Sequence, residues 1–312
     1  MRGMKLLYGL GAAASALTAA GLAVAQDAGA KLEVLGKPHD AGLGLQAAAS
    51  ELAEDIHFLD DMVNWIIIGI TLLVLVLLLW VALRYNARVN RTPARFTHNT
   101  PVEVTWTLVP IMILVVIGAF SLPILFKQQE IPEGEVTIKV TGNQWYWHYD
   151  YVDEGFGFDA YMIGQPATID DSAEPGVVPY VMTDAMAKKL ENAGYSRSDF
   201  LLAADQAVVV PVGKIVVMQV TASDVIHSWA LPAFGVKQDG VPGRIAHLWF
   251  RADREGVYFG QCSELCGKDH AYMPITVKVV SEAAYAEWLT GAKAEFASAD
   301  DAAPLPVRLA SN

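Results

Sequence analysis

Four residues that ligate soft metals lie close together near the carboxyl end of this 312-residue chain. Cys262 and Cys266 are the only two cysteines, and His270 and Met273 follow them within the stretch GQCSELCGKDHAYMP (260–274). Thiolate, imidazole and thioether groups suit copper, whereas magnesium and calcium prefer oxygen ligands. The spacing therefore indicates a copper-binding loop.

Three other interpretations of the cysteine pair stay open at this point. Two cysteines in an oxidising compartment usually form a disulfide, although a structural disulfide has no use for a nearby histidine and methionine. Zinc is the competing metal, since two cysteines and two histidines form a common tetrahedral set. The spacing is not the usual C-x2-C, however, and Met273 would be idle. A membrane-anchored carrier that delivers a single copper ion is the third alternative.

A further ligand is expected from another part of the chain. In cupredoxins, copper is bound by a Cys–His–Met loop at one end of a β-sandwich together with one histidine from an earlier strand. His227, within TASDVIHSW (221–229), is the candidate for that histidine. The second cysteine distinguishes this loop from a mononuclear site, because two thiolates can each bridge two metal ions.

The elements that must position this loop begin with an export signal. Residues 1–25 have basic Arg2 and Lys5, then an apolar run rich in Ala, Leu and Gly, then a small-residue A-V-A site, which is typical of a signal peptide. Residues 26–61 are expected to form an exported segment that leads into the membrane.

Two uncharged apolar runs predict a two-helix membrane hairpin at 62–126, with spans at 65–83 and 106–126. At ~1.5 Å per residue each run reaches roughly 30 Å, the thickness of the hydrocarbon core. Four arginines and one acidic residue, Glu103, lie between the runs. By the positive-inside rule this loop is cytoplasmic, which places both termini outside.

Residues 127–290 predict a soluble, all-β domain. Short alternating segments punctuated by Gly and Pro, without alternating helices, favour an antiparallel sandwich or barrel. Residues 155–204 form a more polar insert, and 291–312 are expected to be a disordered tail. The strands are expected near 136–140, 207–212, 214–220, 246–252, 256–262 and 275–280, and helices near 184–192 and 281–289.

Nearly all of the chain's negative charge lies after the hairpin. Residues 127–312 contain 25 Asp and Glu against 14 Lys and Arg, a net charge of −11 out of the chain's −12. We expect no nucleic-acid partner for so acidic a domain. Such charge is usually just a solvated face, although opposite potentials can raise the encounter rate with a basic partner.

The motif C-S-E-L-C-G-x-x-H-x-x-M-P resembles that of cytochrome c oxidase subunit II, of the aa3 type found in alphaproteobacteria and mitochondria. DVIHSW (224–229) and the aromatic run QWYW (144–147) share this resemblance, which covers the whole mature chain. Nitrous oxide reductase has a similar loop but lacks the paired spans and carries a large additional domain. Subunit II of quinol oxidases shares the spans and barrel but lacks the copper ligands.

The resemblance implies a two-helix transmembrane hairpin followed by a cupredoxin-like domain, in the bacterial inner membrane with both termini and the copper domain in the periplasm. It implies that two thiolates bridge a dinuclear copper A centre, that one histidine binds each copper, and that a thioether and a backbone carbonyl are weak ligands. The Glu264 side chain is implied to bind a magnesium or manganese ion shared with subunit I. The implied copper ligands are Cys262, Cys266, His227, His270, Met273 and the carbonyl of Glu264.

The resemblance also implies roles outside the loop. Trp145 would be the point where electrons enter from cytochrome c, and Glu103 would mark the mouth of a proton path into subunit I. Without the resemblance, Trp145 would be an ordinary interfacial aromatic and Glu103 a helix-capping acid. Trp147 and Tyr149 are expected in the core. The acidic positions implied to bind cytochrome c are Asp150, Asp153, Asp159, Asp205 and Asp224.

The implied function is electron transfer within a larger enzyme. The chain would accept electrons from cytochrome c and pass them to haem a of subunit I. There haem a3 and copper B would reduce oxygen to water, coupled to proton pumping. The expected partners are therefore subunits I and III, cytochrome c and the lipid bilayer.

Overall fold

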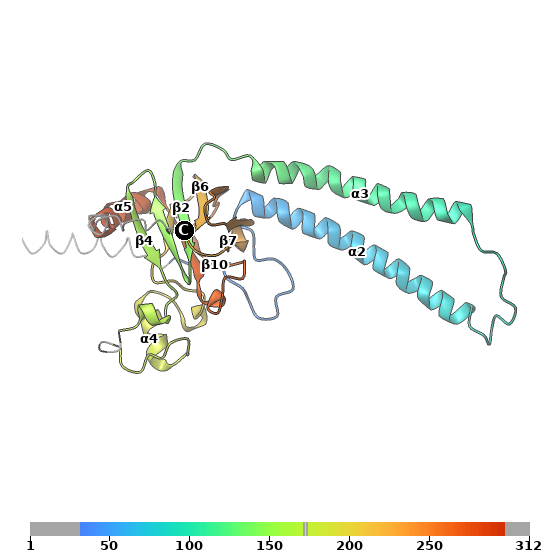
Figure 1. Ribbon diagram of the computed structural model, residues 1–312, viewed down its shortest axis with the longest axis horizontal. Coiled ribbons are helices and arrows are strands. Elements are labelled where there is room, and N and C mark those ends of the chain that lie inside the picture. Colours follow the sequence, from blue (N-terminus) through green and yellow to red (C-terminus); the bar gives the residue numbers. More distant parts are fainter. Residues whose placement is uncertain (1–31, 171, 173, 297–312) are drawn as a thin grey trace, which may run out of the picture.

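The computed structural model describes residues 32–296 apart from 171 and 173. The predicted signal peptide and residues 297–312 of the predicted tail lie outside the described residues. The described chain forms a long helical hairpin with a β-sandwich at one end (Figure 1).

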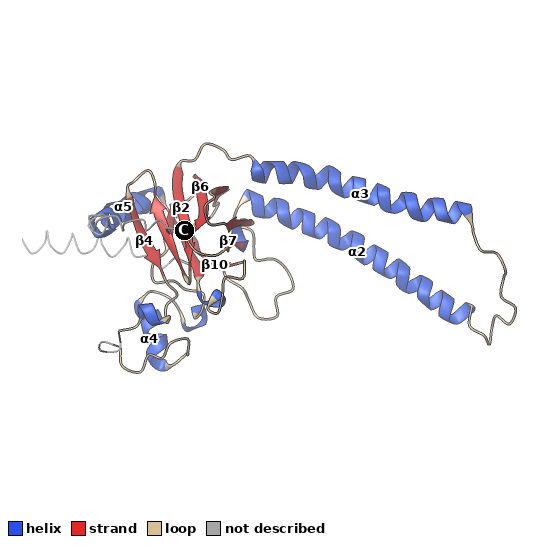
Figure 2. Cartoon of the chain, in the orientation of Figure 1, coloured by secondary structure: helices blue, strands red, loops and turns tan. Residues whose placement is uncertain are grey.

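Helices α2 (Glu51–Arg84) and α3 (Thr100–Gln129) lie side by side as the hairpin (Figure 2). They contain the two predicted spans, and both have the length and apolar composition needed to cross a membrane. Apolar side chains such as Phe58 and Phe120, whose ring centroids are 5.9 Å apart, connect the two helices. The predicted membrane hairpin is therefore present.

Helix α2 begins earlier than the sequence predicted, at Glu51 instead of within 62–65. The Ser50 side chain caps the helix by accepting a hydrogen bond from the amide of Ala53 at 3.1 Å. Glu51 and Glu54 in the first turn place negative charge near the positive end of the helix dipole, which stabilises the start of the helix. The last part of the predicted exported segment 26–61 is thus a polar extension of the first membrane helix.

Two sheets face each other to form the sandwich. One has the strand order β5-β11-β10-β7-β8 with β1 beside β10, and the other has the order β4-β3-β2-β6-β9. The pairs β2–β6 and β5–β11 are parallel, so both sheets are mixed and the expected purely antiparallel arrangement was wrong. The strands are β1 (Val34–Gly36), β2 (Val136–Asn143), β3 (Tyr146–Tyr151), β4 (Phe156–Ala160), β5 (Val208–Pro211), β6 (Ile215–Ala222), β7 (His227–Leu231), β8 (Val236–Gly240), β9 (Ala246–Arg251), β10 (Gly256–Cys262) and β11 (Pro274–Val280).

Aromatic side chains fill the space between the sheets. Trp147 and Tyr149 are 0% and 1% exposed, which confirms their predicted place in the core. They project from β3, whose residues alternate between half-buried and buried. Trp229 from β7 donates a hydrogen bond from Nε1 to the Tyr149 hydroxyl at 3.2 Å, joining the two sheets across the core.

The predicted insert at 155–204 is more ordered than expected. It begins with strand β4, which pairs with β3, and continues through the short 3-10 turns η1 (Pro166–Thr168) and η2 (Arg197–Asp199). Helix α4 spans Asp184–Asn192 as predicted, with Thr183 as its N-cap.

The carboxyl-terminal helix α5 spans Glu282–Phe296, so the predicted domain boundary at 290 was wrong. Residues 291–296 belong to the helix instead of a disordered tail. The reason is apolar packing: the ring of Phe296 lies 5.0 Å from that of Phe158 and 6.2 Å from that of Phe156.

Polar contacts fix the sandwich on the end of the hairpin. Lys127 at the end of α3 forms ion pairs with Asp55 and Glu51 of α2, at 2.7 Å and 2.5 Å. Glu51 also pairs with Arg251 of β9 at 3.1 Å. The Ser50 hydroxyl donates to the carbonyl of Phe234 at 2.8 Å. Both membrane helices are therefore tied to the β domain.

Candidate metal centre

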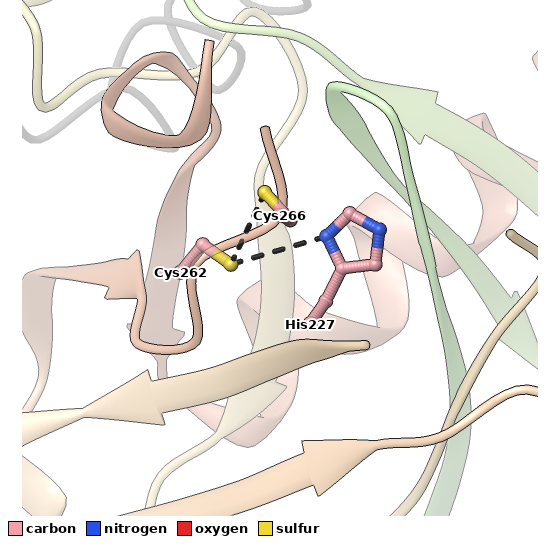
Figure 3. A group of neighbouring side chains, drawn as sticks. All are labelled: His227, Cys262 and Cys266. Atoms are coloured by element: carbon pink, nitrogen blue, oxygen red, sulfur yellow. Dashed lines mark hydrogen bonds between the residues drawn. The ribbon is translucent and has the colours of Figure 1, made fainter. Parts of the chain in front are cut away.

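Two neighbouring antiparallel strands present the first ligand groups. His227 opens β7 and Cys262 closes β10, where Cys262 pairs with Trp229. The loop after Cys262 carries Cys266 back over this end of the sandwich. The side chains of His227, Cys262 and Cys266 converge there (Figure 3).

The sulfur atoms of Cys262 and Cys266 are 3.9 Å apart, and Cys262 Sγ is also 3.9 Å from His227 Nδ1. The ligand atoms of these three residues all lie within 4.8 Å of one another. Both cysteines are buried, and His227 is 0% exposed. The structure therefore brings the distant histidine to the cysteine pair, as the sequence predicted.

The other predicted ligands lie around the same two sulfurs. His270 Nδ1 and Met273 Sδ are each 3.5 Å from Cys266 Sγ. They are carried by the short 3-10 turn η4 (His270–Tyr272) and the residue after it. The Glu264 carbonyl lies 3.4 Å from Cys262 Sγ, while the Glu264 side chain is exposed. All six predicted ligand groups thus gather at one end of the sandwich.

This donor set fits copper. Both cysteines are free, and their 3.9 Å separation far exceeds a disulfide bond of about 2.05 Å. Metal–thiolate bonds are about 2.3 Å long, so sulfurs at this spacing can both reach the same ion. Two thiolates, two imidazoles and a thioether form a soft set that suits copper.

The two thiols differ in acidity. Burial raises the pKa of Cys262, but hydrogen bonds from His227 and the backbone outweigh it and lower that pKa to about 7. Burial and the adjacent charge of Cys262 raise the pKa of Cys266 to about 12. Without a cation, ionisation of both thiols together is therefore disfavoured. A bound metal ion would supply the positive charge that two thiolates need.

Asp224 and Gly142 orient the His227 ring. Asp224 Oδ1 lies 2.9 Å from His227 Nε2, so an Nε2–H tautomer leaves Nδ1 free on the side of the sulfurs. Gly142 lies against the other side, where a Cβ atom would come within 2.7 Å of the ring. A side chain at position 142 would push the histidine out of place.

Trp145 lies beside the loop and contacts it directly. Its indole Nε1 donates a hydrogen bond to the carbonyl of Cys266 at 3.2 Å, and the Gln144 side chain donates to the same oxygen at 2.8 Å. Lys268 lies over the Trp145 ring, 5.3 Å from its centroid. A half-buried aromatic ring is therefore one hydrogen bond from Cys266, a predicted ligand.

The five predicted docking acids do not form one cluster. Asp224 accepts a hydrogen bond from the amide of Gln144 at 2.8 Å, which places it beside Trp145. Asp205 accepts one from the amide of Tyr161 at 2.8 Å, and the Tyr161 ring stacks on Tyr146. These two acids therefore flank the start of β3.

The remaining three acids lie along β3 and β4. Asp150 and Asp159 contact the same His148 ring at 3.0 Å and 2.7 Å, and Asp150 also pairs with Lys139. Asp153 lies in the turn at the opposite end of β3 from Trp145, where it accepts a hydrogen bond from the amide of Thr137. Basic neighbours thus balance part of the predicted acidic surface.

Glu103 lies in the first turn of α3, far along the hairpin from the sandwich (Figure 1). Its carboxylate accepts a hydrogen bond from the amide of Asn99 at 3.1 Å, while the Asn99 side chain accepts one from Val102 at 3.4 Å. The two hydrogen bonds cap the first turn of α3 from both directions, although Glu103 is the fourth helical residue, one position beyond that of a capping box. The structure gives Glu103 a capping contact.

Sequence reasoning missed three groups that hold the centre. Asp224 was expected to bind a protein partner, yet it contacts a ligand histidine; the three-residue spacing between Asp224 and His227 was the available signal. Gln144 and Trp147 donate hydrogen bonds to the carbonyls of Cys266 and Met273, at 2.8 Å and 3.1 Å. No spacing signal marks these, because the contacts join residues more than a hundred positions apart.

The sequence matches the family descriptions of two domains of one kind of protein. Residues 136–178 and 179–280 match "Cytochrome C oxidase subunit II, periplasmic domain", and residues 38–124 match "Cytochrome C oxidase subunit II, transmembrane domain". Together the matches cover most of the chain, both spans and the sandwich included.

Related proteins agree with these matches. Cytochrome c oxidase subunit 2 of Cereibacter sphaeroides is 57% identical over 293 residues, covering 94% of this chain and 93% of that protein. A probable cytochrome c oxidase subunit 2 of Rickettsia bellii is 41% identical over 248 residues, covering 79% and 82%. The crystal structure of the periplasmic domain of subunit II of cytochrome oxidase (CoxB) of Bradyrhizobium japonicum is 42% identical, covering 53% of this chain and 99% of that one, with a TM-score of 0.41.

Proposed function

We propose a function for this chain that follows from its family. The chain belongs to the cytochrome c oxidase subunit II family. The chain is a membrane-anchored subunit of a haem–copper oxidase, a family whose general role is electron transfer. We propose that it accepts electrons from cytochrome c at a dinuclear copper A centre and passes them to haem a of subunit I. Haem a3 and copper B of subunit I would then reduce oxygen to water, with proton pumping.

One observation carries this proposal: two buried free thiols lie 3.9 Å apart with a histidine beside each. The two cysteines and the two histidines would hold the copper pair, and Met273 Sδ and the Glu264 carbonyl would be its weak ligands. Copper supplies one-electron redox chemistry when it is bound. Burial keeps water from the thiolates, and Asp224 keeps the His227 ring in one orientation.

Trp145 would receive the electron from the donor protein. Its ring is partly accessible, and its hydrogen bond to the Cys266 carbonyl links it to the ligand loop. Electronic coupling falls steeply across empty space, so this contact favours the route through Trp145. Asp205 and Asp224, which flank the start of β3, would form the main part of the docking surface. Its outer part would be Asp150, Asp159 and Asp153.

Two further acidic residues would face subunit I. The exposed Glu264 side chain offers carboxylate oxygen, which suits a magnesium or manganese ion shared at that interface. Glu103 would mark the mouth of a proton path, in addition to its capping contact. We place the hairpin in the bacterial inner membrane beside subunits I and III, with the sandwich in the periplasm.

Copper content and electron paramagnetic resonance of the purified chain test this proposal. Two coppers per chain are expected, with a seven-line signal, because an electron shared equally by two copper nuclei of spin 3/2 couples to both. Replacement of Cys266 by Ser should leave no shared-electron signal. One copper per chain would favour a copper carrier, and bound zinc would favour a structural site; either result would refute the electron-transfer proposal.

A further inference from the structure

One segment of the β domain packs beside the metal centre and contacts residues next to the predicted ligands. We name the described residues of 161–206 (161–170, 172 and 174–206) the brace segment; it joins β4 to β5 and contains α4 (Figure 1). Its apolar side chains form a second, smaller hydrophobic cluster against Val257 and Phe259 of β10, the strand that ends at Cys262. The brace segment therefore packs on a ligand-bearing strand.

The brace segment reaches the centre through three contacts. The buried Gln165 side chain donates a hydrogen bond to the carbonyl of Trp145 at 3.1 Å. The carbonyl of Leu201 accepts one from the side chain of Gln261, the residue before Cys262, at 3.3 Å. The ring of Tyr180 lies on that of Tyr272, with 4.4 Å between centroids.

The Tyr180–Tyr272 contact helps to fix the position of two predicted ligands, His270 and Met273. Tyr272 lies in η4 between His270 and Met273, and both of these side chains cover Cys266 Sγ at 3.5 Å. A single 3-10 turn has few hydrogen bonds of its own and poor hydrogen-bond geometry. Its position must therefore depend on side-chain contacts such as this one.

Tyr180 adopts an unusual backbone conformation to make this contact. Its φ is 60°, in the left-handed region that bulky residues seldom occupy, and its amide donates to the carbonyl of Gly164 at 3.0 Å. Such a conformation persists where the surrounding structure holds it, and often marks a functional position. Here it directs the ring toward the metal loop.

We propose that the brace segment positions the turn His270–Met273 against Cys266, and that Tyr180 is the positioning residue. This role of the brace segment in holding copper ligands rests on the proposed copper centre. The brace segment holds the turn in the copper-free chain as well, where its effect can be measured. Without the Tyr180 ring, η4 moves away more often and uncovers Cys266. Cys262 is held by β10 on the other side and stays covered.

The test measures alkylation of each cysteine by iodoacetamide. The full chain is prepared in detergent without copper and with both thiols reduced, and the modified cysteine is located by mass spectrometry. In Tyr180→Ala, Cys266 should react roughly three- to tenfold faster, the factor expected when an aromatic pair is lost. Cys262 should react at its normal rate and serves as the internal control.

Two matched variants separate positioning from general loosening. Tyr180→Phe keeps the ring and should restore the normal rate at Cys266. Tyr285→Ala removes a different ring contact, with Trp288 on α5 at 5.9 Å, and should leave both cysteines unchanged. An unchanged rate at Cys266 in Tyr180→Ala would overturn the proposal. Equal acceleration at both cysteines would also overturn it.

A second variant covers the case in which Tyr180→Ala does not fold. Tyr272→Ala removes the same contact from the other side and should expose Cys266 by a similar factor. If Tyr272→Ala leaves Cys266 as protected as in the unaltered chain, the proposal fails.

The copper-loaded chain gives an independent readout. Tyr180→Ala should change the hyperfine splitting of the copper signal, and Tyr180→Phe should restore it. If the unaltered chain binds no copper pair, the proposed function fails, while the alkylation result still decides the role of the brace segment.

Discussion

Asp224 connects two parts of the metal centre through one carboxylate. Its oxygens accept hydrogen bonds from the amides of Gln144 and Val225, at 2.8 Å and 2.6 Å, and contact His227 Nε2 at 2.9 Å. The peptide that carries Trp145 and the ring of His227, a proposed copper ligand, therefore share a support. Asp224, which the family resemblance assigns to partner docking, therefore also has a structural role within the domain.

We expect Asp224→Asn to weaken copper binding by about 10- to 100-fold, the usual effect of losing a carboxylate behind a ligand histidine. Competition with a copper chelator measures the affinity. Asp205→Asn is the matched control, because Asp205 contacts backbone amides and no ligand. Equal copper affinity in the two variants would show that Asp224 does not orient His227.

His148 gives the domain a pH-dependent contribution to stability. Hydrogen bonds to Asp150 and Asp159 raise the pKa of His148 to about 9. Since its unfolded pKa is about 6.5, the contribution is complete below that pH and is lost as the pH rises through about 9. The His148 side chain is 35% exposed, so solvent screening limits this contribution to about 1 kcal/mol.

Replacement of His148 by Gln should therefore lower the free energy of unfolding by about 1 kcal/mol at pH 6. The difference from the unaltered chain should vanish above pH 9. Thermal unfolding at several pH values measures both. A difference that is the same at pH 6 and pH 10 would exclude ion pairing as its cause.

At the scale of elements, helix α5 packs against the end of the β3–β4 hairpin that carries the turn. The Trp288 ring lies 5.2 Å from that of Tyr151, and Phe296 at the end of the helix lies against Phe156 and Phe158. Lys293 also pairs with Glu154 at 2.5 Å. The last turn of α5 is therefore part of the fold.

We expect Phe296→Ala to lower the free energy of unfolding by about 1–2 kcal/mol, the effect of exposing a partly buried aromatic side chain. Chemical denaturation of the purified chain measures it. Glu287→Ala, on the exposed side of the same helix, should change the stability by less than about 0.5 kcal/mol. Equal stability in the two variants would mean that α5 does not depend on this ring.

Sequence pattern predicted the elements whose signal is local. The two spans, helix α4 and strands such as β10 and β11 follow from hydrophobicity and capping alone. Strand β7 was missed because its buried residues begin with polar His227 and Ser228, so it shows neither alternation nor a continuous apolar run. The last turns of α5 were missed because the packing of Phe296 on β4 is a tertiary contact that no local pattern shows.

The same division holds for the candidate site. The spacing of Cys262, Cys266, His270 and Met273 predicted the ligand loop, and the ligand pattern of cupredoxins pointed to His227. Spacing could not reveal the support from Gln144, Gln165 or Tyr180, since these residues reach the loop only through tertiary contacts.

At the scale of the whole molecule, the acidic sandwich is held on one end of the hairpin. Lys127, Glu51, Asp55 and Arg251 join both membrane helices to β9. This joint gives the metal centre a defined position relative to the membrane. A partner in the bilayer and a donor in solution can then approach the centre from different sides.

The domain's net negative charge should steer a basic cytochrome c. We expect the association rate to fall as ionic strength rises, because salt screens the attraction. Asp205→Asn should lower the rate at low salt, whereas Asp153→Asn, at the far end of β3, should have little effect. Stopped-flow mixing over a salt series measures both. Equal effects of the two substitutions would place the docking surface away from Trp145.

The most direct test of the central claim is electron transfer into the intact oxidase carrying Trp145→Leu. Rapid mixing with reduced cytochrome c should show that the fast reduction of the centre is lost, while the copper content and copper spectrum stay normal. This result follows if the donor's electron passes through the indole that contacts the Cys266 carbonyl. A normal fast phase with an intact copper spectrum would contradict the account.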